Sequence, residues 1–194
     1  VHDANILNSH RLSDEPFEFV ESGEDLYQVI NDGFFQSRYD CEDDTSILQP
    51  IPYVILFDTQ GKVFSYVRAS NIKDYGDKRL FGKHSIGVGG HIGVNDGPNY
   101  IAGCIQREVL EEEIEIEGTY SKPKLVGTIM AYDKPVDRVH LGLAFGMVVD
   151  GKVKPKEDSL VSGKMIPIPE ITNHDQYETW SKVLVPNLQQ IYEK

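Results

Sequence analysis

The stretch that decides the fold is residues 89–112, which read GGHIGVNDGPNYIAGCIQREVLEE. A glycine-rich loop runs into a segment predicted to be helical, which carries Glu108, Glu111 and Glu112. Because these residues are spaced i, i+3, i+4, an α-helix places their carboxylates on one face. Such a face is costly without a positive charge on it, and a hard cation such as Mg²⁺ prefers oxygen ligands. The alternative interpretation, a solvated acidic helix face, is commoner for such a cluster taken alone.

This stretch resembles the Nudix box, the loop–helix motif of the Nudix hydrolase family. The family pattern is Gly-x5-Glu-x7-Arg-Glu-U-x-Glu-Glu-x-Gly-U, where U is apolar. Residues 107–112 match its Arg-Glu-U-x-Glu-Glu core residue for residue. With the flanking strands included, the likeness extends over about residues 50–190. Residues 85–92 also look like a Nudix subgroup described as phosphoesterase-like.

The chain departs from the family pattern at both ends of the box. Asn99 stands where the family has its first glutamate, and residues 113–115 replace the closing x-Gly-U. If Gly90 is the family's loop glycine, the loop is three residues longer than usual, whereas Gly93 in that role gives regular spacing. Without the closing glycine, we expect the helix to continue to about Glu115.

The resemblance implies a hydrolase that uses Mg²⁺, or alternatively Mn²⁺, to cleave a nucleoside diphosphate linked to another group. Glu111 and Glu112 are then the stronger metal ligands, Glu108 is the third, and the Gly90 carbonyl is a further ligand. Either Glu108 or Glu111 also orients or deprotonates the attacking water. Arg107 either orients a box glutamate from one position away or forms an ordinary surface ion pair.

Positive charge is scarce in this chain, so basic residues near the box are candidates for binding substrate phosphate. Arg68, Arg79, Lys83 and His84 precede the box, and His91 follows its glycine pair directly. We predict substrate contacts for Arg68, Arg79 and His91, and His91 is the best placed of them. For each of the four residues before the box, the ordinary interpretation is a solvated charge in a loop.

Composition limits the classes of function. A chain of 194 residues suits one domain with an extension, which we divide into residues 1–49 and a hydrolase domain over residues 50–194. The formal net charge of −12 argues against nonspecific binding to nucleic acids or anionic membranes. Two distant cysteines make a disulfide improbable, and no apolar run approaches the roughly 20 residues that span a bilayer. We therefore expect a cytoplasmic protein, and the resemblance adds the expectation of a homodimer.

Strand and helix patterns alternate along the chain and predict an α/β fold. The predicted strands lie at residues 17–20, 52–57, 62–68, 85–88, 124–132, 139–149 and 163–168. Helices are predicted at residues 24–35, in the box, and at residues 180–192, where Pro186 lies either near the first turn or at a kink. Residues 40–46 are predicted to be an acidic loop and residues 150–151 a turn. The resemblance implies that these elements form an α/β/α sandwich with a mixed β-sheet.

Three functions compete at this point. A Mg²⁺-dependent pyrophosphohydrolase acting on a small nucleoside diphosphate derivative is favoured by the complete set of glutamates. A Nudix-fold module that binds or senses a nucleotide without cleaving it is left open by Asn99. A Nudix-like isomerase of an isoprenyl diphosphate needs an additional acid and usually a reactive cysteine, and Cys104 within the box helix is not obviously in such a position. No motif identifies the base, the sugar or the linked group.

Overall fold

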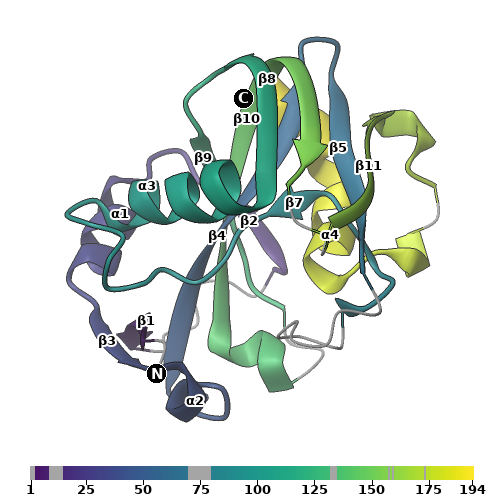
Figure 1. Cartoon of the computed structure of the whole chain (residues 1–194). Helices are drawn as coiled ribbons and strands as arrows, with labels where there is room; N and C mark the ends of the chain where they lie inside the picture. Colours follow the sequence, from purple (N-terminus) through teal and green to yellow (C-terminus); the bar gives the residue numbers. More distant parts are fainter. Residues whose placement is uncertain are drawn as a thin grey trace.

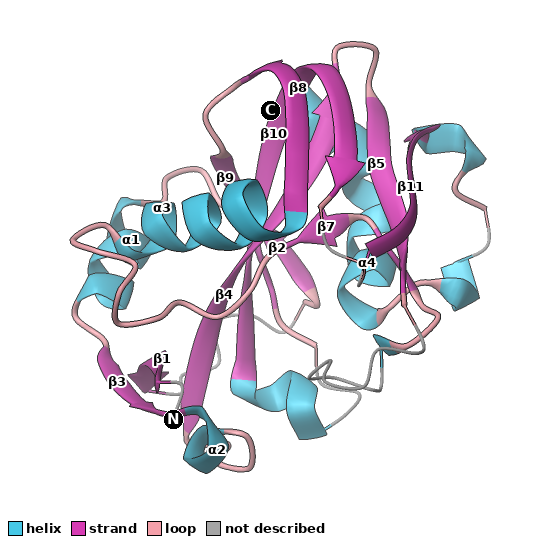
Figure 2. Ribbon diagram, in the orientation of Figure 1, coloured by secondary structure: helices cyan, strands magenta, loops and turns pink. Residues whose placement is uncertain are grey.

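In the computed structural model of the chain, a mixed β-sheet lies between two layers of helices (Figures 1 and 2). The structure describes residues 3–8, 15–69, 80–131, 135–156, 158, 160–172 and 174–194. Two strands at the centre, β4 (Ile47–Asp58) and β10 (His140–Pro155), run parallel, and the other ladders are antiparallel. The predicted α/β/α sandwich is therefore confirmed.

The sheet centre is buried on both faces. Four successive residues of β4, Val54, Ile55, Leu56 and Phe57, are at most 1% exposed. Val54 and Leu56 pack into the core beneath the box helix, whereas Ile55 and Phe57 pack into the core beneath the C-terminal helices. A continuous apolar run of this kind is what a strand covered on both faces requires.

The main path of the sheet has the order β11-β5-β4-β10-β9-β2. Its outer strands are β5 (Lys62–Arg68), β9 (Lys124–Ile129), β11 (Leu160–Pro167) and β2 (Phe17–Phe19). The sequence predicts strands at the positions of β2, β4, β5 and β11, and β4 and β5 form a hairpin. Because β2 pairs with β9, the N-terminal segment contributes a strand to the main sheet.

Shorter strands branch from this path. They are β1 (Asp3–Asn8), β3 (Phe34–Ser37), β6 (His84–Ser85), β7 (Gly87–Val88) and β8 (Ile114–Tyr120). β1 joins β3 to the start of β4, and β8 pairs with the second half of β10. β7 pairs with the middle of β4 and leads directly into the box.

One face of the sheet carries α1 (Glu24–Asn31) and the box helix, which consists of α3 (Tyr100–Cys104) and η2 (Ile105–Glu113). The other face carries the predicted C-terminal helix, divided into α4 (Thr179–Leu184), η6 (Val185–Asn187) and α5 (Leu188–Glu193). The remaining short helices are α2 (Arg38–Cys41), η3 (Pro135–Val139), η4 (Ile168–Glu170) and η5 (His174–Gln176). No helix in the described part of the chain combines the length and apolar character that a membrane crossing requires.

Several local predictions are wrong. The first helix ends at Asn31, before the strand β3, and the predicted acidic loop begins with α2. The box helix ends at Glu113, because Ile114 already pairs with Pro155 as the first residue of β8.

Residues 150–151 do not form a turn, since β10 continues through them to Pro155. Gly151 and Gly118 face each other across β10 and β8 with φ angles of 152° and 146°. A Cβ on either one would lie 2.2 Å from a carbonyl oxygen of the other strand. Glycine at these positions permits close contact between two strands and does not end a strand here.

Candidate active site

The loop of the box begins with two glycines that leave room for other groups. A Cβ at Gly89 would lie 1.8 Å from the carbonyl oxygen of Pro52 in β4. At Gly90 it would lie 2.3 Å from the carboxyl group of Glu108. The Glu108 carboxylate therefore packs against bare loop backbone, and two predicted metal ligands, Glu108 and Gly90, are neighbours.

Asn99 caps the box helix. Its side-chain oxygen accepts a hydrogen bond from the amide of Ala102 at 3.3 Å, at the start of α3. The residue that stands in place of the family's first glutamate therefore satisfies a free helix amide. Close packing follows at Gly103, where a Cβ would lie 1.7 Å from the carbonyl oxygen of Asp96 in the loop.

The helix continues from Ile105 as a π-helix, and the α-helical periodicity predicted for this segment is wrong. In a π-helix, hydrogen bonds join residues five apart, and such segments are frequent at functional sites. Gln106 Nε2 accordingly donates to Glu111 Oε1 at 3.1 Å, and Arg107 Nη1 lies 3.8 Å from Glu112 Oε1. Glu108 and Glu112 both approach Arg107, whereas Glu111 lies beside Gln106. The binding of one metal by all three carboxylates remains a prediction.

Arg107 joins the loop to the helix. Its Nε and Nη2 donate to Asp96 at 2.7 and 2.9 Å, and Nη2 also donates to the carbonyl of His91 at 3.0 Å. Its Nη1 pairs with Glu108. The hydrogen bond to Asp96 is the largest influence that raises the pKa of Arg107, and the Glu108 carboxylate adds to it. This arrangement supports an orienting role more than an ordinary surface ion pair.

Asp96, the main partner of Arg107, is not among the residues predicted from the sequence. Its side chain is 2% exposed and also accepts a hydrogen bond from the amide of Gly93 at 2.7 Å. The dipeptide of Asp96 and Gly97 is typical of a turn, and Gly97 has a φ of 83°. A turn residue is ordinarily solvated, so its burial under the helix follows only from the folded loop.

Cys104 is a buried thiol that donates to the carbonyl of Gly90 at 3.4 Å. Burial raises the pKa of Cys104 far above its usual range, and the carboxylates of Asp96 and Glu108 raise it further. A reactive cysteine needs the opposite shift. The environment of Cys104 therefore argues against the isomerase considered above.

The ring of His91 lies against His140, at the start of β10. The two Nε2 atoms are 3.1 Å apart, and the rings are in edge contact. Burial is the main reason why the pKa of His91 lies well below its usual range, and Arg38 and His140 lower it further. A carboxylate oxygen of Glu42 lies near both rings. The structure therefore places His91 next to the N-terminal segment, and its predicted contact with substrate stays a prediction.

Of the two arginines predicted to contact substrate, the structure describes Arg68. Arg68 is 8% exposed at the end of β5, with its guanidinium 5.4 Å from the ring centre of Tyr66. The Tyr66 hydroxyl in turn donates to the carbonyl of Gly87, just before the box, at 2.8 Å. Arg79 lies outside the described residues. Phosphate binding by either arginine stays a prediction.

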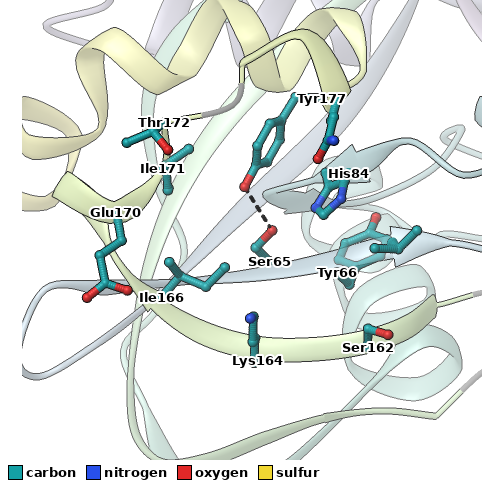
Figure 3. A pocket seen from close by; sticks show the side chains of 12 residues that line it. Ser65, Tyr66, His84, Ser162, Lys164, Ile166, Glu170, Ile171, Thr172 and Tyr177 are labelled. Atoms are coloured by element: carbon teal, nitrogen blue, oxygen red, sulfur yellow. Dashed lines mark hydrogen bonds between the residues drawn. The ribbon is translucent and has the colours of Figure 1, made fainter.

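A cavity of about 380 Å³ opens between β5, β11 and residues 170–172 and 176–177 (Figure 3). Its described lining combines a lysine, Lys164, with hydroxyl groups, among them those of Ser65 and Tyr177, which are 3.3 Å apart. The volume lies in the range of small-molecule sites. Tyr66 also lines the cavity, and through its bond to Gly87 it connects the cavity wall to the box.

The chain is similar to known proteins in sequence and in fold. No family model matches the chain. Protein YmaB of Bacillus subtilis (strain 168) is 32% identical over 161 residues, which are 78% of this chain and 76% of that protein. The structure of Tm1382, provisionally described as a Nudix hydrolase, aligns with a TM-score of 0.81 at 25% identity and covers 97% of this chain and 99% of that one. The MutT protein from Methanosarcina mazei Go1 shares the fold, with a TM-score of 0.52 at 14% identity over 76% of this chain and 96% of that one.

Proposed function

Because this chain belongs to the Nudix hydrolase family, we propose that it cleaves the pyrophosphate linkage of a nucleoside diphosphate derivative with the help of a divalent cation. The observation that carries the proposal is the arrangement of Arg107, which fixes the Glu108 carboxylate between the helix and the glycine loop. A carboxylate held in this way is ready to bind without first being ordered.

The groups at the box fit a hard cation such as Mg²⁺ or Mn²⁺. All of the proposed donors are oxygens, from the carboxylates of Glu108, Glu111 and Glu112 and the carbonyl of Gly90. The contact of Glu108 with the bare backbone of Gly90 brings two of these donors together. A bound divalent cation supplies charge to neutralise the phosphates and makes a coordinated water more acidic.

The side chains of the box have different tasks in this account. Arg107 holds Glu108 in place as a ligand. Glu111 is exposed and accepts a hydrogen bond from the neutral amide of Gln106, so we assign it the proton of the attacking water. The water oxygen forms a bond to phosphorus while the bond from phosphorus to the bridging oxygen breaks. The bridging oxygen leaves with the electron pair, and the products are two phosphate compounds.

Hydrolysis of a nucleoside diphosphate derivative in ¹⁸O-labelled water tests this assignment. We expect the label in one of the two products, and a fall in kcat of about 10²–10⁴-fold in Glu111→Gln, the usual range for removal of a general base. Glu108→Gln should instead raise the Mg²⁺ concentration needed for half-maximal activity. Full kcat in Glu111→Gln would show that the proton goes elsewhere.

A module that binds a nucleotide without cleaving it is the second candidate. Asn99 favours this reading, because an amide that caps the helix replaces a carboxylate of the family pattern. Metal-dependent nucleotide binding with no labelled product in the same experiment would support it.

A further inference from the structure

A second group of ligand atoms lies outside the carboxylates of the box. It combines one carboxylate oxygen of Glu42 with the ring nitrogens of His91 and His140, all within 4.8 Å of one another. Among the described residues, no other set of three such side chains comes this close. Imidazole nitrogens suit borderline metals such as Zn²⁺, whereas Mg²⁺ prefers oxygen, so this group differs in chemistry from the box.

The spacing of the two imidazoles fits a metal. Two nitrogens bound to a tetrahedral Zn²⁺, with bonds of about 2.0–2.1 Å, lie about 3.3–3.4 Å apart. The Nε2 atoms of His91 and His140 are 3.1 Å apart, so they need to move apart by only a few tenths of an ångström to bind a metal together. Without a metal, one ring donates its Nε2–H to the other in an N–H···N hydrogen bond. With that proton on Nδ1 of the same ring, both Nε2 atoms can bind a metal, because a neutral imidazole coordinates through its unprotonated nitrogen.

A buried polar group beside the cluster provides independent support. Gln49 pairs with His140 in the register of β4 and β10, and neighbouring side chains in register project from the same face of a sheet. Gln49 is 0% exposed, and both polar atoms of its amide have no hydrogen-bond partner among the described residues. Such a group is costly unless something satisfies it. A water on a metal held by His140 would supply a partner.

The positive charge of Arg38 lies next to Glu42 and would repel a cation bound there. Its Nε lies 3.0 Å from Glu42 Oε1, so without a metal the guanidinium neutralises the carboxylate. The Arg38 side chain is 45% exposed, and an exposed ion pair of this kind contributes little free energy. Arg38 can therefore turn into solvent when Glu42 binds a metal.

We propose that Glu42, His91 and His140 form a second metal site, which binds a Zn²⁺-type cation with water as a further ligand. Glu42 directly follows α2 in the N-terminal segment, His91 follows the glycine pair of the box, and His140 begins β10. The metal links these three elements and holds the N-terminal segment against the catalytic loop. The site does not depend on the hydrolysis proposed above.

Co²⁺ is a suitable probe, because its visible absorption reports four-coordinate sites that also bind Zn²⁺. The full chain is titrated with Co²⁺ in excess Mg²⁺, which occupies the box. We expect a four-coordinate spectrum that saturates near about one equivalent and disappears when Zn²⁺ is added. In His140→Gln and Glu42→Gln we expect the affinity for Co²⁺ to fall by about 100-fold or more. Loss of a residue that only orients a metal ligand costs about 10–100-fold, and loss of the ligand itself should cost at least as much.

Two matched variants identify the site. His84→Gln removes a histidine at the cavity, and the double variant Glu111→Gln, Glu112→Gln removes box carboxylates. Both should keep the Co²⁺ spectrum. A spectrum that survives His140→Gln and Glu42→Gln, or one lost with the box carboxylates, overturns the proposal. X-ray absorption at the Zn edge of the unaltered protein decides the question if a variant misfolds, since the proposal requires two imidazole ligands and a spectrum without imidazole contradicts it.

Discussion

Arg107 and Asp96 form a two-point ion pair, in which Nε lies 2.7 Å from Oδ1 and Nη2 lies 2.9 Å from Oδ2. The Asp96 side chain is 2% exposed in the loop, and Arg107 is 33% exposed on the helix. Because Nε and Nη2 of Arg107 both bond to Asp96, the loop cannot move along the helix without breaking these two hydrogen bonds. The same guanidinium contacts Glu108, so the ion pair also sets the position of a proposed ligand.

The substitution Asp96→Asn should destabilise the protein. It retains the shape of the side chain but removes the charge and one acceptor oxygen, so at least one of the hydrogen bonds from Arg107 and the Gly93 amide is lost. We expect the free energy of unfolding to fall by about 1.5–3 kcal/mol, the range for hydrogen bonds to charged groups. Urea denaturation measures this change. Glu117→Gln, which removes the exposed partner of Lys154, is the control and should leave the midpoint unchanged. Equal midpoints for the two variants would contradict the role of Asp96.

The substitution Gly90→Ala should impair activity more than folding. Its Cβ would displace the Glu108 carboxyl group, which is the end of a flexible side chain, so the fold can adapt. Gly93→Ala is the matched control in the same loop, because the nearest atom would lie 3.7 Å from its Cβ. We expect metal-dependent kcat/KM to fall about 100-fold in Gly90→Ala, as for a misplacement of about 1 Å. Similar activity in the two alanine variants would show that the position of Glu108 is unimportant.

The substitution Arg107→Lys tests whether geometry or charge matters. Lysine retains the positive charge but cannot contact Asp96, the carbonyl of His91 and Glu108 at once. We expect kcat to fall about 10–100-fold, the cost typical of losing a residue that orients a metal ligand, with a higher Mg²⁺ requirement. Titration of activity with Mg²⁺ measures both effects. A lysine variant with normal kcat would mean that Arg107 acts only through its charge.

Cys104 should resist alkylation in the folded protein. Its raised pKa leaves less thiolate at pH 8 than an ordinary cysteine has, and its side chain is fully buried. Iodoacetamide followed by mass spectrometry should modify Cys104 only when urea is added. Rapid alkylation of Cys104 in the native protein would contradict this prediction and would again favour the cysteine-dependent isomerase as the function.

The sequence predicted the sheet and its helices because their signals are local. The apolar run around Val54, the hairpin turn before β5 and the motif around Arg107 each lie within a short segment. Errors arose where distant parts of the chain decide the structure. Residues 150–151 resemble a turn, but Gly151 stays in a strand because Gly118 faces it from β8.

Parts of the candidate site could not be predicted from the sequence, because they also depend on contacts between distant parts of the chain. Asp96 looks like a solvated turn residue until the loop folds back on the helix and buries it against Arg107. The group of Glu42, His91 and His140 draws on three separate segments, so no spacing in the sequence indicates it. The π-helix was missed because the i, i+3, i+4 spacing of the glutamates is the spacing of an α-helix.

The most direct test is turnover of a panel of nucleoside diphosphate derivatives with Mg²⁺, with the double variant Glu111→Gln, Glu112→Gln beside the unaltered protein. Glu115→Gln is the control, since Glu115 is exposed and lies just beyond the helix in β8. We predict Mg²⁺-dependent cleavage of at least one pyrophosphate linkage, retained by Glu115→Gln and lost in the double variant. Cleavage that survives in the double variant would contradict the proposed site.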